Sequence, residues 1–252
     1  MYISNNKKLI NIALIFLALY VANALISTGR SNFTGMIVNI FVIPLGIFAI
    51  IAHEIAHGYC AYILGDPTAK LSGRLSLNPI KHFDPIGVLS MIFFHIGWAK
   101  PVPVNYSRLN NPRRDIFLVS MAGPLTNLSL AFISACVLKF LYYLLKTGSL
   151  ENIAAFTSSP ALFIKTSFEI IAVGGIQINL MLFIFNLIPI PPLDGSKMFM
   201  CILPHELARQ YEELEKYGLF ILIALVYTNS LSYIILPPMK ICYEYLFKFI
   251  IT

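Results

Sequence analysis

The chain has 252 residues, of which 58% are hydrophobic and only 12% are charged, against about 25% charged residues in a soluble domain. This composition, with a mean hydropathy of +0.76, excludes an ordinary soluble globule and predicts an all-α, polytopic membrane protein. The net charge of +6 does not indicate a nucleic-acid partner, because the basic residues cluster in loops, where the positive-inside rule accounts for them. The four cysteines show neither a metal-type spacing nor a disulfide framework.

Five apolar segments are long enough to cross a bilayer. The first follows Lys7 and Lys8 and could mimic a secretory signal, but it is longer than a signal core and no cleavage-type site follows, so we expect a retained helix. A sixth apolar stretch, Met239–Ile251, is separated from the fifth span by Pro237 and Pro238 and is short, so a sixth crossing and an interfacial helix both remain open. We therefore expect five to six transmembrane helices, of which the first five are Leu9–Ile26, Met36–Leu64, Ile116–Leu145, Phe168–Ile188 and Tyr217–Leu236.

The loop between the second and third spans carries a large share of the basic residues. From Gly65 to Asp115 it holds seven Lys and Arg residues, which is a strong cytoplasmic mark. We therefore expect the second span to run from outside to inside. The apolar stretch Gly87–Trp98 within this loop predicts a membrane-associated region rather than a polar linker. Because Pro101 and Pro103 lack backbone donors, the segment that follows can form an edge strand at best.

The second span contains the sequence His53-Glu54-Ile55-Ala56-His57. His53 and His57 lie one turn apart on one helix face, so both imidazoles can bind the same zinc ion. Glu54 can serve as general base to water that the metal activates. A charged residue near the bilayer centre costs about 2.5–3.5 kcal/mol on insertion scales, which disfavours a polar cluster without a function. The motif predicts a hydrolytic site with one zinc ion per chain.

A catalytic zinc site needs a third protein ligand beside an open position. His82, His95, His205 and the acidic residues are candidates, and Asp194 is the strongest of them. It lies in the stretch Asn186–Gly195, in which three prolines prevent a regular helix. This stretch ends the fourth span, which also runs inward. A carboxylate on the same side as the motif histidines could complete a His/His/Asp set, although Asp194 could instead cap the next helix.

Together these motifs resemble those of the site-2 proteases, the family of intramembrane zinc metalloproteases. HExxH alone is a weak signal, but HExxH in a span joined to NLIPIPPLDG near the end of a later span is highly specific. Further matches are Ala122–Asn127 in the third span and the loop pair LNPIKHFDPIG and GWAKPVPVN. The resemblance runs from Ile51 to Phe220 and implies a single intramembrane protease domain over residues 1–252, from the compact branch without PDZ or CBS domains.

The resemblance also implies roles for individual residues. Position by position, it indicates three zinc ligands and one catalytic acid/base, namely His53, His57, Asp194 and Glu54. Asn127 and Asn186 match family asparagines that stabilise the oxyanion or hold the substrate strand, although Asn127 could equally form interhelical hydrogen bonds. The expected substrates are membrane proteins or membrane peptides, cleaved in or near transmembrane segments in the lipid bilayer of the cell. The active site is expected towards the cytoplasmic side of the cell membrane.

The main alternative is a non-catalytic membrane zinc-binding protein or a metal transporter. Glu54 argues against both, because neither transport nor simple binding needs an acid/base beside the ligands. A membrane di-iron desaturase or hydroxylase would need several histidine boxes, and this chain has five histidines, of which only two are paired. Neither the physiological substrate nor the oligomeric state follows from the sequence.

Overall fold

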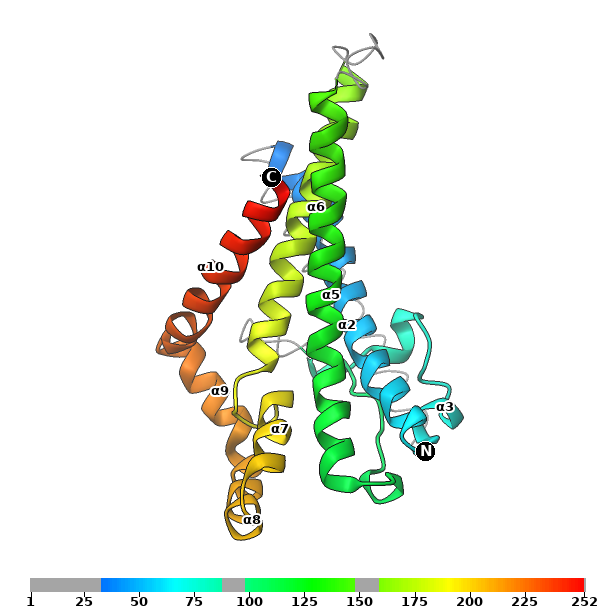
Figure 1. Cartoon of the computed structure of the whole chain (residues 1–252), viewed down its shortest axis with the longest axis vertical. Coiled ribbons are helices and arrows are strands. Elements are labelled where there is room, and N and C mark those ends of the chain that lie inside the picture. Colours follow the sequence, from blue (N-terminus) through cyan, green and yellow to red (C-terminus); the bar gives the residue numbers. More distant parts are fainter. Residues whose placement is uncertain (1–32, 88–97, 148–158, 252) are drawn as a thin grey trace.

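The computed structural model describes residues 33–87, 98–147 and 159–251, and every regular element within them is helical (Figure 1). Three long helices pack against one another and form the body of the molecule: α2 (Phe33–Ile63), α5 (Pro112–Lys146) and α6 (Ser159–Asn186). The shorter elements are α3 (Thr68–Leu71), η1 (Pro79–His82), η2 (Tyr106–Arg108), α7 (Asp194–Ile202), α8 (His205–Glu213), η3 (Leu214–Tyr217), α9 (Gly218–Tyr227) and α10 (Ser230–Ile251).

Three of the described helices are long and apolar enough to cross a membrane, and they coincide with the second, third and fourth expected spans. A fourth crossing is made only if two further segments, which are bent relative to each other, count as one span: His205–Tyr227 and Ser230–Ile251. The described residues thus account for three or four spans rather than five to six, and the first expected span, Leu9–Ile26, lies outside them. The three candidate spans are Phe41–Ile63, Pro112–Leu144 and Ser167–Asn186.

The expected fifth span, Tyr217–Leu236, is wrong as a continuous helix. The chain bends by 80° between α9 and α10, next to Asn229, whose φ of 57° is a left-handed conformation that asparagine tolerates. The helix α10 then continues through Pro237 and Pro238, where the sequence had suggested a break. Prolines are tolerated within membrane helices because neighbouring groups satisfy the freed backbone. Residues 239–251 are therefore the second half of α10.

The packed core lies where α5, α6 and α10 meet. Small residues let these helices approach closely, and Ala131, Ala135 and Ala172 are buried there together with Ile176 and Leu180. Membrane helices pack in this way because lipid offers no hydrophobic driving force between them, so close contact must stabilise the interface. A second apolar cluster joins the end of α6 to α9 and α10. Both clusters hold α6 in place just before the turn that leads to α7.

The loop between α2 and α5 folds back beside the C-terminal end of α2 (Figure 1). It contains three single-turn helices, and its residues 98–105 form neither helix nor strand. The prolines at 101 and 103 lack backbone donors, which accounts for the absence of strand pairing in this described segment. Residues 88–97, the centre of the apolar stretch in this loop, lie outside the described residues.

Candidate metal centre

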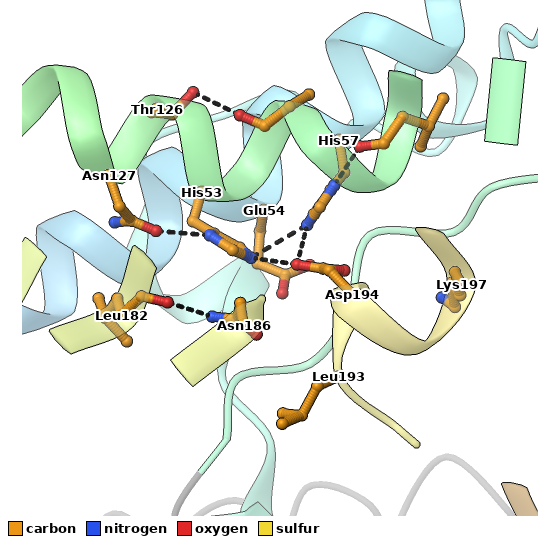
Figure 2. A network of polar contacts seen from close by, with 12 residues as sticks. His53, Glu54, His57, Thr126, Asn127, Leu182, Asn186, Leu193, Asp194 and Lys197 are labelled. Carbon is orange, nitrogen blue, oxygen red and sulfur yellow. Dashed lines mark hydrogen bonds and ion pairs between the residues drawn. The ribbon is translucent and has the colours of Figure 1, made fainter. Parts of the chain in front are cut away.

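Three side chains from distant parts of the chain converge beside α2 (Figure 2). His53 and His57 project from α2, and Asp194 is the first residue of α7. Asp194 Oδ2 lies 3.0 Å from His53 Nε2 and 3.1 Å from His57 Nε2. The two Nε2 atoms are 3.0 Å apart. Within the described part of the chain, this is the group of His, Cys, Asp and Glu side chains whose geometry could hold a metal ion.

Hydrogen bonds on the far side of each imidazole fix its tautomer. His57 Nδ1 lies 2.6 Å from the carbonyl oxygen of Val119, which can only accept a hydrogen bond. His53 Nδ1 lies 2.6 Å from Asn127 Oδ1, which is likewise an acceptor. Both Nδ1 atoms therefore donate, so each imidazole in its neutral form presents the lone pair of Nε2 towards Asp194. Metal-binding histidines in proteins have this arrangement, with a hydrogen-bond acceptor behind the ring.

Asn127 is the centre of a hydrogen-bond network that joins α2, α5 and α6. Its side chain is fully buried, and Nδ2 donates to Ala49 O at 3.4 Å and to Asn179 Oδ1 at 3.0 Å. Asn179 is also buried and donates from its own Nδ2 to Gly175 O at 2.9 Å. These partners orient the Asn127 amide with its oxygen towards His53. Asn179 belongs to no sequence motif, and its only signal in the sequence is an amide in an apolar span.

A metal ion suits the chemistry of this donor set. When both imidazoles are neutral, two lone pairs and a carboxylate oxygen face one another here, which is unfavourable unless a cation lies between them. Asp194 Oδ2 is buried and has no hydrogen-bond partner. The donor separations of 3.0–3.1 Å compare with about 3.3 Å between the ligands of tetrahedral zinc at bond lengths of about 2.0–2.1 Å. The three residues therefore fit zinc as a group.

Gly123 of α5 forms one wall of the centre. A Cβ atom at this position would lie 2.4 Å from His57 Nε2 and 2.6 Å from His53 Nε2. Real Cβ atoms essentially never approach other atoms so closely. The helix α5 can therefore approach the two histidines only because residue 123 has no side chain. Gly123 belongs to the segment Ala122–Asn127 that matches the family motif, and the structure places its close contact against the imidazoles.

Glu54 lies on α2 beside this group, and a backbone amide from the loop holds its carboxylate. Glu54 Oε2 accepts a hydrogen bond from the Val102 N–H at 2.8 Å. Val102 belongs to the loop segment of residues 98–105, which is far from Glu54 in sequence. The other carboxylate oxygen, Oε1, has no hydrogen-bond partner among the described residues. One oxygen is thus held in place while the other is available to a proton.

The turn between α6 and α7 brings Asp194 back to the histidines. Asn186 ends α6, and its Nδ2 donates to Leu182 O at 3.0 Å within its own helix (Figure 2). At Gly195 a Cβ atom would lie 2.4 Å from Leu187 O, so α7 can fold against the end of α6 only with glycine there. Asp194 is the first residue of α7, and Leu193 rather than Asp194 occupies the N-cap position. The Asp194 carboxylate is directed at the imidazoles instead.

Lys197 lies one turn after Asp194 and joins α7 to the loop. Its Nζ donates to the hydroxyl oxygen of Tyr106 at 3.0 Å. Burial alone would lower the pKa of Lys197, but the nearby Tyr106 hydroxyl and the Asp194 carboxylate outweigh burial and raise this pKa. Lys197 therefore stays charged close to the metal centre. The sequence analysis did not single out this residue.

The other two histidines in the described part of the chain lie outside this group. His82 is buried in η1, where its Nε2 lies 2.8 Å from Ser76 O. His205 begins α8 and is exposed. His95 lies outside the described residues.

Comparison with known proteins agrees with this geometry. Residues 40–228 match the family model of peptidase family M50. A Bacillus subtilis protein named "Putative zinc metalloprotease YwhC" is 41% identical over 188 residues, which cover 75% of this chain and 80% of the relative. Proteins named "Putative zinc metalloprotease Rip2" from Mycolicibacterium smegmatis and Mycobacterium tuberculosis are 27% and 26% identical over 197 and 199 residues, each covering 77% of this chain and 69% of the relative.

No solved structure matches the chain. The family model nevertheless spans well over half of the chain and includes both motif histidines, the adjacent glutamate and Asp194. This chain therefore belongs to peptidase family M50, the intramembrane zinc metalloproteases known as site-2 proteases.

Proposed function

We propose that this chain, as a single intramembrane protease domain over residues 1–252, hydrolyses peptide bonds in or near the transmembrane segments of membrane proteins. The observation that carries the proposal is the convergence of His53, His57 and Asp194 beside Glu54. A metal transporter or a simple zinc-binding protein would have no use for a carboxylate held in this position. A protease needs it, because hydrolysis requires a group that accepts and returns a proton.

The residues of the centre divide the chemistry between them. One zinc ion bound by His53, His57 and Asp194 would polarise the scissile carbonyl and make water more acidic. Glu54 takes a proton from the attacking water at Oε1 and returns it to the leaving amine. Asn127 uses its amide to hold His53 in the metal-binding tautomer, so we assign it a positioning role in place of oxyanion stabilisation.

The substrate must present an exposed carbonyl to this centre. A transmembrane helix hides each carbonyl in its i→i−4 hydrogen bonds, so the substrate has to unwind locally. Helix-breaking residues near the cleavage site should therefore favour hydrolysis. Asn186 is suited to hold the unwound strand, because its side chain is only partly buried and makes one hydrogen bond, within its own helix.

We further propose that the chain crosses the cell membrane five to six times and that its centre is reached from the cytoplasm. The seven basic residues between Gly65 and Asp115 support this orientation. His57 lies six residues before the end of α2 at Ile63, which is about 9 Å at 1.5 Å per residue. Water from the cytoplasmic side would therefore have only a short distance to travel.

The substitution Glu54→Gln tests the mechanism. The amide keeps the shape of the side chain but cannot accept the proton, so cleavage of a model transmembrane substrate should slow by about 10²–10⁴-fold. Zinc content per purified chain should stay at the wild-type level, because Glu54 is not a proposed ligand. Glu169→Gln, which changes a glutamate in α6 away from the centre, should leave both quantities unchanged. A wild-type cleavage rate in Glu54→Gln would refute the proposed mechanism.

A further inference from the structure

The segment Pro101–Asn105, which we name the strap, lies along the face of α2 that carries Glu54. The Val102 N–H donates to Glu54 Oε2 at 2.8 Å. One turn further along α2, a Cβ atom at Gly58 would lie only 2.6 Å from Val102 Cγ1. The buried Val102 side chain therefore rests directly on the helix. The strap thus contacts α2 through both its backbone and its side chain, at the position of the proposed base.

The sequence of the strap dedicates one backbone donor to Glu54. Pro101 and Pro103 have no N–H, so the amide of Val102 is the single backbone donor in the Pro-Val-Pro unit. That donor is directed at the carboxylate. Since a trans peptide group is planar, its N–H and C=O point in opposite directions, and whatever fixes the carbonyl also fixes the amide.

Arg74 holds this peptide group from the other side. Its Nη2 donates to Lys100 O at 2.7 Å and to Pro101 O at 3.2 Å. The Pro101 carbonyl and the Val102 amide belong to one peptide group, so this group lies between the Arg74 guanidinium and the Glu54 carboxylate. A cation on the carbonyl also polarises the group and strengthens the N–H as a donor, as in other hydrogen-bond chains.

The far end of the strap is tied to the end of α2. Asp66 is fully buried, and its Oδ2 accepts a hydrogen bond from the Asn105 N–H at 2.6 Å. Burial would raise the pKa of Asp66, but hydrogen bonds from Thr68 and Asn105 outweigh burial and lower this pKa. The carboxylate therefore stays ionised and keeps its hold on the strap at neutral pH. Both ends of the strap are anchored by charged side chains.

We infer that the strap positions Glu54 and that Arg74 is a positioning residue of the reaction, acting through the Pro101–Val102 peptide group. This inference rests on the proposed role of Glu54 as the base. With one carboxylate oxygen held by Val102, the other keeps a constant position for proton transfer. Arg74 contacts none of the three proposed metal ligands, so its loss should leave zinc in place while the base becomes misplaced.

Kinetics of Arg74 variants test the inference. For Arg74→Ala we expect kcat to fall about 10- to 100-fold, since misplacing a catalytic group by about 1 Å can cost this much. KM and zinc content should change little. Arg74→Lys should recover part of kcat, because an ammonium group can reach a carbonyl but lacks the guanidinium fork. Lys81→Ala is the matched control, because Lys81 donates to Gly73 O in the same loop without touching the strap.

Hydrogen exchange gives a second readout that does not depend on activity. Val102 carries the one exchangeable backbone amide between residues 101 and 103, so its protection can be followed by mass spectrometry in a peptide over the strap. We expect faster exchange at Val102 in Arg74→Ala and wild-type exchange in Lys81→Ala. Wild-type kcat in Arg74→Ala, a fall in kcat without faster exchange, or an equal fall in Lys81→Ala would each overturn the inference. Failure of the proposed function is recognised separately, by activity in Glu54→Gln.

Discussion

Asn127 Oδ1 lies 2.6 Å from His53 Nδ1, on the side of the imidazole ring opposite the Nε2 atom that faces Asp194. This hydrogen bond connects α5 to α2, and Asn179 extends it to α6. Three membrane helices therefore meet behind a single proposed ligand. Every side-chain nitrogen and oxygen atom of Asn127 and Asn179 has a hydrogen-bond partner, which makes the network a rigid support for the ring.

The first prediction concerns this support. Asn127→Ala should weaken zinc binding by about 10- to 100-fold, as loss of a hydrogen-bond partner behind a metal-binding histidine typically does. Competition with a chelator on the purified protein measures the effect. Asn186→Ala is the control and should bind zinc as wild type does, because Asn186 hydrogen-bonds only within α6. Wild-type zinc affinity in Asn127→Ala, with a fall in kcat, would assign Asn127 to the oxyanion instead.

The second prediction concerns the third ligand. Asp194→Ala should lose both zinc and proteolysis, because it leaves two imidazoles without the anionic donor that completes the set. His82→Ala should keep most of its zinc, since His82 bonds to Ser76 O in η1 and lies outside the metal group. Zinc per purified chain decides between the two. Full occupancy in Asp194→Ala together with loss in His82→Ala would reverse the assignment.

The third prediction concerns the wall of the centre. Gly123→Ala introduces a Cβ atom only 2.4 Å from His57 Nε2, so either α5 or the imidazole must move and zinc binding should be lost or strongly reduced. Gly46→Ala is the control within α2, because its new Cβ would meet Ile178 at an ordinary 3.8 Å. Chelator competition and thermal unfolding of both variants measure the effect. Equal zinc affinity in the two variants would contradict the close approach of α5.

The fourth prediction concerns orientation in the membrane. The helix α5 has 35 residues and is about 50 Å long, enough for its ends to lie on opposite sides of a bilayer. In a background without the four cysteines, Ser72→Cys should react with a charged, impermeant thiol reagent in inside-out vesicles. Lys146→Cys, at the far end of α5, should react in right-side-out vesicles. Both positions are exposed, and the reverse pattern would overturn the proposed cytoplasmic orientation.

The sequence alone was sufficient wherever the information is local. Hydrophobic runs located three spans to within a few residues, as the expected Met36–Leu64 and the observed Phe33–Ile63 illustrate. The helical period put His53 and His57 on one face, and counting crossings put Asp194 on their side of the membrane. The Pro-Pro pair in α10 was misread as a break, because proline is a strong signal in water but is tolerated in a packed membrane helix, whereas the bend at Asn229 depends on a single backbone dihedral.

Only the tertiary structure decided which partner faces each functional side chain. A helical pattern says which residues share a face, but it does not say which neighbouring helix that face meets or at what height. Three contacts depend on the rotation and axial position of packed segments that are distant in sequence. They are the hydrogen bond between Asn179 and Asn127, the hydrogen bond from the Val102 amide to Glu54, and the close approach of Gly123 to the imidazoles. These are set by close contact between helices, a property of their combined surfaces rather than of any one segment.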